Sequence, residues 1–310
     1  MMNPTLIFAT RPSALARWQT RYIIQQIQAH WDNLICQEML ITTTGDRDLA
    51  TALPEIGGKG LFTYELEQAL REGRVHVAVH SLKDLPTQET PGLTIGAIPQ
   101  RTDVRDVLVC PAGLTLEELP QEAVVGTSSN RRGAQILAYR PDLHIQPIRG
   151  NIDTRIHKTL EGQFDAIILA AAGVIRLGLQ KHITQYLPLE IMLPAPGQGA
   201  LGVQCREDDE QTLRWLSAIE HQGTHRAVSA ERAFLSGLGG GCSLPVGALA
   251  EVQGEEITLQ GVVASPDGQH ILRLTETGDD PNRVGQDLAQ QAIERGAGAY
   301  ILQNNYGNRS

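Results

Sequence analysis

Residues 123–141 read AVVGTSSNRRGAQILAYRP, and the pattern of this stretch predicts the class of the fold. A short apolar run leads into small residues from Gly126 to Ser129, and a helix-forming segment follows and stops near Pro141. Strand, turn and helix in this order form the repeating unit of α/β proteins. Free backbone N–H groups at the start of such a helix attract anions, so the turn is also a candidate binding element.

The same order recurs along the chain. VHVAVHSL at residues 75–82 alternates like a strand and leads into Lys83 and Asp84, and FDAIILA at residues 164–170 reads as a buried strand. LIFAT at residues 6–10 precedes Ser13, a candidate cap for a helix whose apolar side chains fall near one face: Leu15, Trp18, Tyr22 and Ile27. This alternation predicts open, largely parallel sheets with helices on both faces, which bind ligands at the carboxyl ends of their strands.

The pattern changes toward the end of the chain. LPAPGQGALG at residues 193–202 has the composition of a crossing linker. EITLQGVVASPDGQHILRLTETG at residues 256–278 reads as two strands joined by a turn at Pro266, Asp267 and Gly268, and a closing helix is expected over residues 282–295. These segments predict a smaller α+β domain after about residue 220.

Composition excludes several classes of protein. The net charge of −9 over 310 residues argues against nucleic acid or an anionic membrane surface as the main partner. Four cysteines are too scattered for a Cys-x-x-Cys metal or redox pair and too few for a secreted disulfide scaffold. Because the sequence shows no secretion signal and no membrane-spanning run, we expect a cytoplasmic protein without a membrane partner.

Three features carry candidate chemistry. In GLGGGCSLPVGA at residues 237–248, the glycines ahead of Cys242 favour an attachment point on a movable loop over an inert buried thiol. Asp84 follows a strand, where a carboxylate can stabilise a cation formed during a reaction, whereas His80 is interpreted as a satisfied buried histidine. Six arginines lie beside predicted strand ends and helix starts: Arg11, Arg131, Arg132, Arg149, Arg155 and Arg176. The ordinary interpretation of any one of them is a surface or ion-pair residue. Together they indicate a basic cleft for a strongly anionic ligand.

Taken together, several stretches resemble the porphobilinogen deaminase family, also called the hydroxymethylbilane synthases. In chain order they are ATRPSALA, TTGD, GGKGLFTYELEQAL, VAVHSLKDLPT, VGTSSNRRGAQ, RGNIDTR, DAIILAAAGVIRLGL, PGQGALGVQCR and ERAFLSGLGGGCSLPVG. The resemblance spans roughly residues 6–247, and the motifs around Cys242 and around Lys83 and Asp84 are its most specific parts.

The resemblance implies an α/β protein of three domains. Two are similar to the lobes of periplasmic binding proteins, with the chain returning to the first lobe after Pro196, and the third is a smaller α+β domain that carries the cysteine. We therefore expect domain 1 at residues 1–98 and 200–219, domain 2 at residues 99–199 and domain 3 at residues 220–310.

The resemblance also implies a reaction. Four porphobilinogen molecules are condensed head to tail, with loss of ammonia, into hydroxymethylbilane, a linear tetrapyrrole on the route to haem and related pigments. The primer is a dipyrromethane cofactor joined by a thioether to the cysteine that matches Cys242. Loss of ammonia leaves an electrophilic azafulvene, a cation when protonated, and the carboxylate matching Asp84 engages pyrrole N–H groups and assists proton transfer. We expect a monomer that needs no metal and passes its product to uroporphyrinogen-III synthase.

Motif matches divide the binding residues into two sets. The cofactor and its acid groups are assigned to Cys242, Lys83, Asp84, Thr127, Ser129, Arg131 and Arg132. The incoming substrate and the growing chain are assigned to Arg11, Ser13, Phe62, Ser81, Arg149, Arg155 and Arg176. Because every porphobilinogen carries an acetate and a propionate, the growing chain gains two carboxylates per addition, which accounts for the arginines.

Four positions depart from the family pattern. Tyr64 stands where many members have Lys, His76 where Asp is common, Val104 where Pro is frequent, and Asn130 where Leu is usual. None of these changes removes a group assigned to catalysis. Tyr64 and His76 leave open an effect on loop closure or on local charge.

Two other classes of function compete with this interpretation. A noncatalytic binding module is the main rival, because two-lobed α/β proteins often bind small anions without changing them. Such a module would bind its ligand reversibly and release no ammonia, and both the missing secretion signal and the cysteine loop argue against it. An anion-dependent phosphotransferase is the weaker rival, because GGKGLF lacks the spacing of a Walker loop.

Overall fold

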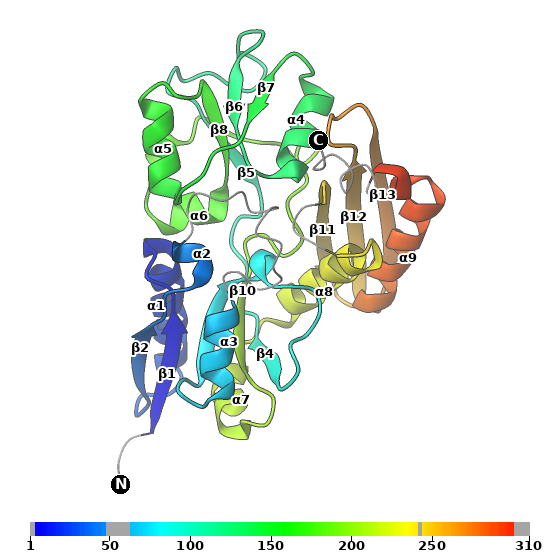
Figure 1. Ribbon diagram of the computed structural model, residues 1–310. Helices are drawn as coiled ribbons and strands as arrows, with labels where there is room; N and C mark the ends of the chain where they lie inside the picture. Colours follow the sequence, from blue (N-terminus) through cyan, green and yellow to red (C-terminus); the bar gives the residue numbers. More distant parts are fainter. Residues whose placement is uncertain (1–3, 48–62, 241–243, 301–310) are drawn as a thin grey trace. The chain divides into compact units, whose positions relative to one another are not determined.

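The computed structural model describes residues 4–47, 63–240 and 244–300 of the chain. The chain divides into two compact units, the first made of Met1–Thr102 with Ala200–His225 and the second of Asp103–Gly199 with Arg226–Ser310 (Figure 1). The chain therefore returns to the first unit at residues 199–200, inside the segment that was predicted to be a crossing linker.

The first unit is built on one five-stranded sheet. Its strands are β1 (Thr5–Thr10), β2 (Ile35–Leu40), β3 (Val77–Ser81), β4 (Leu93–Ala97) and β10 (Leu201–Arg206). Their order in the sheet is β2-β1-β3-β10-β4, with β1 parallel to β2 and β3, and β10 antiparallel to β3 and β4. Four of these five strands therefore run in one direction, as expected for a largely parallel sheet, and β10 runs against them.

Helices cover both faces of this sheet. They are α1 (Ala14–Gln28), α2 (Thr44–Arg47), α3 (Tyr64–Arg71), α7 (Glu210–Leu216) and the short 3-10 helices η1 (Leu82–Asp84) and η3 (Ser217–Ile219). Val77 and Val79 of β3 share a core cluster with α1, whereas Ala78 shares one with α3. The strand predicted at residues 75–82 is confirmed as β3, but its residues do not alternate between buried and exposed: residues 77–80 are all buried, because both faces of β3 are covered.

Helix α1 begins as predicted but buries a different face. Ser13 caps it, since its Oγ accepts a hydrogen bond from the Ala16 backbone N–H. Trp18 is 37% exposed and stacks on Tyr22 with the ring centroids 5.2 Å apart. The buried residues are Ala16, Gln19, Thr20, Ile23 and Ile27. The predicted apolar face is therefore confirmed at Ile27 and in part at Tyr22, which packs partly buried against the same core, and it is wrong at Trp18, which is exposed.

His76, one of the four departures from the family pattern, extends the pairing of β1 with β3. Its backbone N–H donates to the Ile7 carbonyl at 2.9 Å, and its Nδ1 accepts from the Ile7 N–H at 3.1 Å. Burial lowers the pKa of His76, against an opposing attraction from Asp209, which keeps the ring in the neutral form that can accept this bond. His76 therefore continues the hydrogen bonding between β1 and β3 beyond the first residue of β3.

The second unit contains another five-stranded sheet of the same design. Its strands are β5 (Asp106–Val109), β6 (Val124–Gly126), β7 (His144–Gln146), β8 (Ala166–Ala170) and β9 (Gln185–Tyr186). Their order is β7-β6-β8-β5-β9, with β6 parallel to β7 and β8, and β5 antiparallel to β8 and β9. Here too one strand of the five runs against the other four.

The helices of this sheet follow the strands in the predicted order. They are α4 (Asn130–Tyr139), α5 (Ile152–Leu160), α6 (Ala171–Arg176) and the 3-10 helix η2 (Gln180–His182). Ile136 of α4 shares a core cluster with Ile168 of β8, and Ile156 of α5 shares another with Ile167. Because neighbouring residues of β8 point to opposite faces, α4 and α5 cover opposite sides of the sheet.

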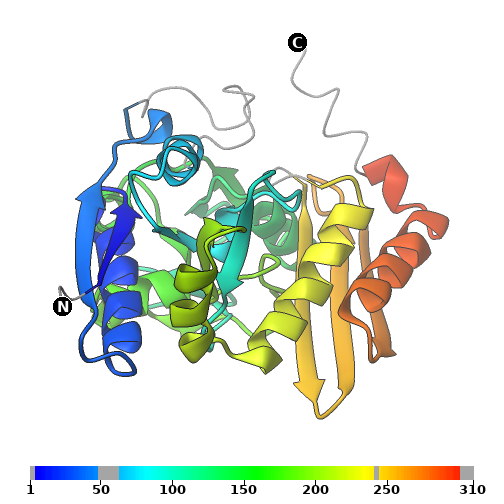
Figure 2. The same cartoon turned by 90° about the horizontal axis from the view of Figure 1, so that it is seen from below.

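A smaller antiparallel sheet completes the second unit. Its strands β11 (Val246–Gln253), β12 (Glu256–Ala264) and β13 (Ile271–Gly278) pair in chain order, and the helices α8 (Gln222–Gly237) and α9 (Pro281–Glu294) pack on them (Figure 2). Leu259 of β12, Phe234 of α8 and Leu288 of α9 are fully buried in one shared cluster. The two predicted strands, their turn and the closing helix are confirmed, and so is the α/β class with a smaller α+β part.

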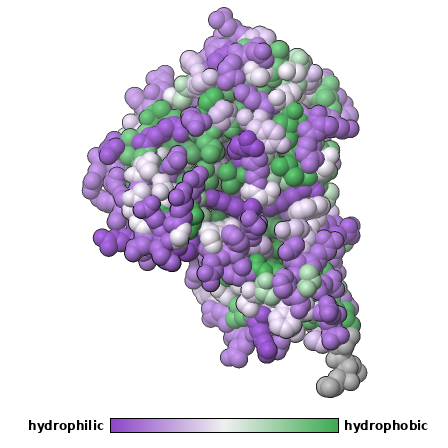
Figure 3. Space-filling view, turned by 180° about the vertical axis from the view of Figure 1, so that it is seen from behind, coloured by the Kyte–Doolittle hydropathy of each residue, from purple (hydrophilic) through white to green (hydrophobic). Residues whose placement is uncertain are grey.

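Hydrophilic and apolar residues are interspersed on the face drawn in Figure 3. Its large hydrophilic areas are typical of a protein surface that meets water. Over the described parts of the chain, no helix combines the length and the apolar character needed to cross a membrane.

We expect a methyl group at Gly285, where α9 crosses α8, to destabilise the fold. The added Cβ would lie 2.5 Å from both the Ala230 carbonyl oxygen and the Ala233 Cβ, and neither atom can yield unless the helices separate. Gly285→Ala should therefore lower the free energy of unfolding by about 1–3 kcal/mol, measured by urea denaturation. Gly298→Ala is the matched control, because its Cβ would meet nothing within 4 Å. Equal losses in the two variants would contradict the close approach.

Candidate active site

The carboxyl ends of β1 and β3 bring polar residues of the first unit to one edge of its sheet. The two strands are parallel neighbours, so the residues that follow them lie close together. Arg11 follows β1, while Lys83 and Asp84 follow β3 within η1. Leu82 is fully buried and its N–H donates to the Ala200 carbonyl at 3.1 Å, which anchors η1. Asp84 is exposed on this anchored turn, so its carboxylate is accessible.

Arg11 is paired with a carboxylate that the sequence analysis did not assign to the site. Its Nη2 lies 2.5 Å from Asp46 Oδ1, and its Nε donates to both carboxylate oxygens at 3.1–3.2 Å. Thr43 donates to Asp46 through both its backbone N–H and its hydroxyl. Burial raises the pKa of Asp46, but these donors outweigh burial and hold it below its usual value. Asp46 therefore stays ionised and offsets the charge of Arg11.

The two serines assigned to the first unit have local partners. Ser13 caps α1, and Ser81 Oγ accepts a hydrogen bond of 2.8 Å from Gln19 Nε2. Each hydroxyl thus lies at the strand-end edge of the sheet with its orientation already fixed by α1. Phe62 lies outside the described residues.

His80 is buried, as predicted, but it is not fully satisfied. His80 lies on β3 with its side chain buried, and within the described chain its Nε2 has no hydrogen-bond partner. Burial lowers the pKa of His80 to about 4, and the neighbouring Gln204 side chain only partly opposes this effect. The ring is therefore neutral near pH 7 and carries no charge toward Asp84.

In the second unit, the turn between β6 and α4 is held together by its own side chains. Thr127 Oγ1 accepts from the Ser129 N–H at 3.2 Å, and Ser129 Oγ accepts from the Arg132 N–H at 3.4 Å. Ser129 is thereby the N-cap of α4. Three of the predicted cofactor residues thus form one continuous structure at the carboxyl end of β6.

Arg131 and Arg132 converge on Asp106, the first residue of β5. Arg131 Nη1 donates to Asp106 Oδ2 at 2.7 Å, and Arg132 donates to Oδ1 through Nε at 3.0 Å and through Nη2 at 2.8 Å. Asp106 is fully buried, and the two arginines are nearly so. Because one carboxylate faces two guanidinium groups, the three side chains carry a net charge of +1 in the interior.

One edge of the Arg131 guanidinium group has no hydrogen-bond partner among the described residues. Its Nη1 donates to Asp106 and also to the Leu193 carbonyl at 2.6 Å, whereas Nε is buried and has no partner among the described residues. Burial lowers the pKa of Arg131, which Asp106 opposes and Arg132 reinforces. A buried donor without an acceptor costs about 1–3 kcal/mol. Arg131 is therefore a candidate receptor for an anion.

Three further arginines lie near the strand ends of the same sheet. Arg149 follows β7, Arg155 lies on α5, and Arg176 ends α6. Arg155 Nε donates to the Gly150 carbonyl and Arg176 Nη2 to the Gly199 carbonyl, both at 2.7 Å. These carbonyl bonds orient the two guanidinium groups.

The sequence analysis missed two residues that shape this site. Asp106 is hidden at the start of an apolar strand, and Gln198 lies in the predicted linker, where its Nε2 donates to Asp106 Oδ1 at 3.0 Å. A charged residue at the head of an otherwise buried strand was the one available signal for Asp106. Cys242 lies outside the described residues.

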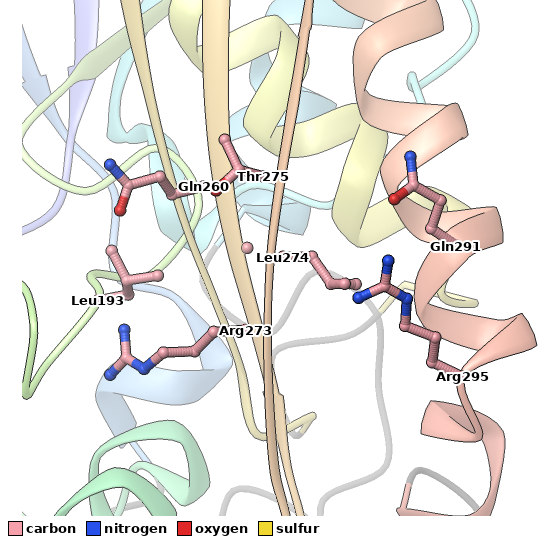
Figure 4. A pocket seen from close by; sticks show the side chains of 8 residues that line it. Leu193, Gln260, Arg273, Leu274, Thr275, Gln291 and Arg295 are labelled. Carbon is pink, nitrogen blue, oxygen red and sulfur yellow. The ribbon is translucent and has the colours of Figure 1, made fainter.

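Two cavities of the described structure lie apart from the predicted residues. One of about 480 Å³ is in the first unit and is bordered by His76, Arg206 and Trp215. Another of about 220 Å³ borders β13, with Arg273 on one side of the strand and Arg295 on the other (Figure 4). None of the sequence-predicted site residues lines either cavity, so the candidate site is the set of strand ends and not one of these hollows.

The chain is similar to one family over nearly its whole length. Residues 6–214 match the model for the porphobilinogen deaminase dipyromethane cofactor binding domain, and residues 225–294 match the model for the porphobilinogen deaminase C-terminal domain. A porphobilinogen deaminase of Brevibacillus brevis is 51% identical, covering 96% of this chain and 97% of the relative. Those of a Roseiflexus species and of Geobacillus kaustophilus are each 46% identical, covering 97% and 96% of this chain and 99% and 96% of the relatives.

The lowered pKa of His80 predicts a loss of stability in acid. The pKa moves from its usual 6.5 to about 4 in the folded protein. Between these values the unfolded chain binds a proton that the folded protein does not, so stability is lost as the pH falls from about 6.5 to about 4. Between pH 7 and pH 4.5, the free energy of unfolding of His80→Asn should therefore fall by roughly 2–3 kcal/mol less than that of the parent protein. Urea denaturation at both pH values measures this difference.

The control for this measurement is His30→Asn, which removes an exposed histidine of the same unit. It should leave the pH dependence as it is in the parent protein. A His80→Asn variant with the parent's pH dependence would show that the buried ring is not responsible.

Proposed function

The chain belongs to the porphobilinogen deaminase family, and we propose a role for each of its site residues in the family's reaction. The reaction joins four porphobilinogen molecules head to tail, with release of ammonia, and yields hydroxymethylbilane. It starts from a dipyrromethane cofactor, to which the domain at residues 6–214 is matched. Membership of this family decides against both a noncatalytic binding module and a phosphotransferase.

The observation that carries the assignment of the cofactor residues is the excess positive charge at Asp106. Two buried arginines share one carboxylate, and the Nε of Arg131 has no acceptor in the described chain. The acetate and propionate groups of a dipyrromethane are the type of acceptor that completes such a site, because a carboxylate binds a guanidinium edge through two parallel hydrogen bonds. The residues present therefore fit the cofactor.

We assign the cofactor's acid groups to Arg131 and Arg132, with the hydroxyls of Thr127 and Ser129 and the ammonium of Lys83 as further donors. Cys242 is assigned as the attachment point through a thioether. When bound, the dipyrromethane supplies the pyrrole carbon to which the first porphobilinogen is joined. The protein's part is to hold its carboxylates and to fix the direction in which the chain extends.

Asp84 is assigned the catalytic role. Its side chain is exposed on η1, which Leu82 anchors to the sheet, so the carboxylate is both accessible and held in place. A carboxylate here accepts hydrogen bonds from pyrrole N–H groups and stabilises the positive charge that develops on the substrate as ammonia leaves. It also offers a base for the proton that must leave the joined pyrrole carbon.

The remaining residues are assigned to the substrate and to the growing chain. Each addition brings two more carboxylates, which need cationic partners beyond those that hold the cofactor. Arg155 and Arg176 are supported in this role because a hydrogen bond to a backbone carbonyl orients each guanidinium group near the strand ends. The full set is Arg11, Ser13, Phe62, Ser81, Arg149, Arg155 and Arg176.

The organisation of the protein is proposed on the same basis. Within the second unit, separate core clusters of the five-stranded and the three-stranded sheet support a division into two domains, hence three in all: residues 1–98 with 200–219, residues 99–199, and residues 220–310. We further propose a cytoplasmic monomer that hands its product to uroporphyrinogen-III synthase, because a reactive linear tetrapyrrole requires a consuming enzyme.

The attachment at Cys242 can be tested by intact-mass measurement. The purified protein should be heavier than its sequence by two linked pyrrole units, and Cys242→Ala should have the mass of the bare chain because it lacks the sulfur. Cys110→Ala removes a buried thiol of the same unit and should keep the added mass. A fully active protein with the mass of the bare chain would exclude the tether.

The role of Asp84 can be tested by its removal. We expect Asp84→Ala to lower kcat by about 10²–10⁴-fold, the usual effect of losing an acid–base or charge-stabilising group, with ammonia release as the assay. Because Asp84 is exposed, the free energy of unfolding should barely change. Asp32→Ala removes an exposed carboxylate elsewhere in the first unit and should leave kcat unchanged. Near-normal turnover by Asp84→Ala would rule out the assigned role.

A further inference from the structure

We propose that Asp106 is a positioning residue for the cofactor: it turns the guanidinium group of Arg131 so that the Nε–Nη2 edge is left for a cofactor carboxylate. This inference rests on the proposed role of Arg131 and Arg132. It assigns to Asp106 no contact with the cofactor, since both of its oxygens are already occupied by protein donors.

The bonding of Arg131 supports this orientation. Its Nη1 group has two N–H bonds, and both are used, one by Asp106 Oδ2 and the other by the Leu193 carbonyl. Among the described residues neither Nε nor Nη2 has a hydrogen-bond partner, and Nε is buried. The Nε–Nη2 edge presents two parallel donors, which is the geometry that a carboxylate accepts. Asp106 and Leu193 therefore fix which edge of Arg131 stays open.

The surroundings of Asp106 hold it firmly in this place. Oδ1 accepts from Arg132 Nε and Nη2 and from Gln198 Nε2, so the carboxylate cannot turn to follow Arg131. Gln135 on α4 fixes the second acceptor of Arg131, because its Oε1 accepts from the Leu193 N–H at 2.9 Å and its Nε2 donates to the Leu193 carbonyl at 3.1 Å. Both ends of the linker at residues 193–198 thereby contribute to the orientation of one guanidinium.

Charge selects the ligand in addition to geometry. With one acid for two arginines, the cluster retains one positive charge that a bound carboxylate neutralises. In the first unit, by contrast, Asp46 forms an ion pair with one arginine, Arg11. The sharing of one carboxylate by two arginines is therefore a particular feature of the Asp106 cluster.

The test measures cofactor occupancy as the ratio of loaded to bare protein in intact-mass spectra, and it does not depend on activity. Asp106→Asn keeps the size of the side chain but loses its charge and one acceptor, which frees Arg131 to turn. We expect occupancy to fall by about tenfold, the scale of one charge-assisted hydrogen bond. Gly285→Ala, which lowers stability in the same unit without touching the cluster, is the control and should keep full occupancy.

Two further variants separate this inference from the proposed function. Arg131→Lys keeps the charge but lacks the Nε–Nη2 edge, so it should lose occupancy like Asp106→Asn. If Arg131→Lys and Asp106→Asn both load fully, the assignment of Arg131 to the cofactor is wrong. If Arg131→Lys loses occupancy and folded Asp106→Asn keeps it, the positioning role of Asp106 alone is overturned.

The conservative variant covers the case in which Asp106→Asn does not fold. Asp106→Glu retains the countercharge and moves the carboxylate by one methylene, so a purely stabilising role is preserved while the orientation of Arg131 is changed. Lower occupancy in folded Asp106→Glu than in Gly285→Ala supports positioning, and equal occupancy overturns it.

Discussion

The Asp106 carboxylate faces two arginines and can neutralise one of them. Burying charged groups is costly unless they are paired and hydrogen-bonded, so the stability of the cluster depends on the bonds that occupy both oxygens of Asp106 and four of the six guanidinium nitrogens. The same bonds tie together the start of β5, the first turn of α4 and the linker at residues 193–198. The site for the anion and the framework of the second unit therefore depend on one ion cluster.

The predicted arginines differ in what offsets their charge. Arg11 has a carboxylate of its own, since its Nη2 lies 2.5 Å from Asp46 Oδ1, whereas Arg131 and Arg132 share the one carboxylate of Asp106. Arg155 and Arg176 each donate to a backbone carbonyl, which fixes the direction of the guanidinium group. The placement of the acids thus distinguishes an arginine with its own carboxylate from two that share one, and counting arginines in the sequence cannot make this distinction.

Both five-stranded sheets place one reversed strand among four that run the other way, β10 in the first unit and β5 in the second. The parallel neighbours β1 and β3 bring Arg11 to the same edge as Lys83 and Asp84, and β6 with its parallel neighbours does the same for the residues of α4 to α6. In each sheet, polar residues from separate parts of the chain therefore lie together at the carboxyl ends of the parallel strands. Asp106 enters its cluster differently, because β5 runs against its neighbour β8 and so begins at the edge where β8 ends.

Local residue patterns predicted the strands at residues 6–10, 75–82 and 164–170, the two strands and turn at residues 256–278, the turn at residues 126–129, the linker at residues 193–202 and, through the motifs, the family and its reaction. These features depend on local propensity or on residue patterns, which a sequence shows directly. Only the tertiary structure decided that α1 buries Ala16 and not Trp18, that β3 is covered on both faces, and that Asp46 and Asp106 are the partners of the arginines. The physical reason is that burial and ion pairing join residues far apart in the chain, such as Asp106 with Arg131 and Gln198, and spacing along the chain carries no record of those distances.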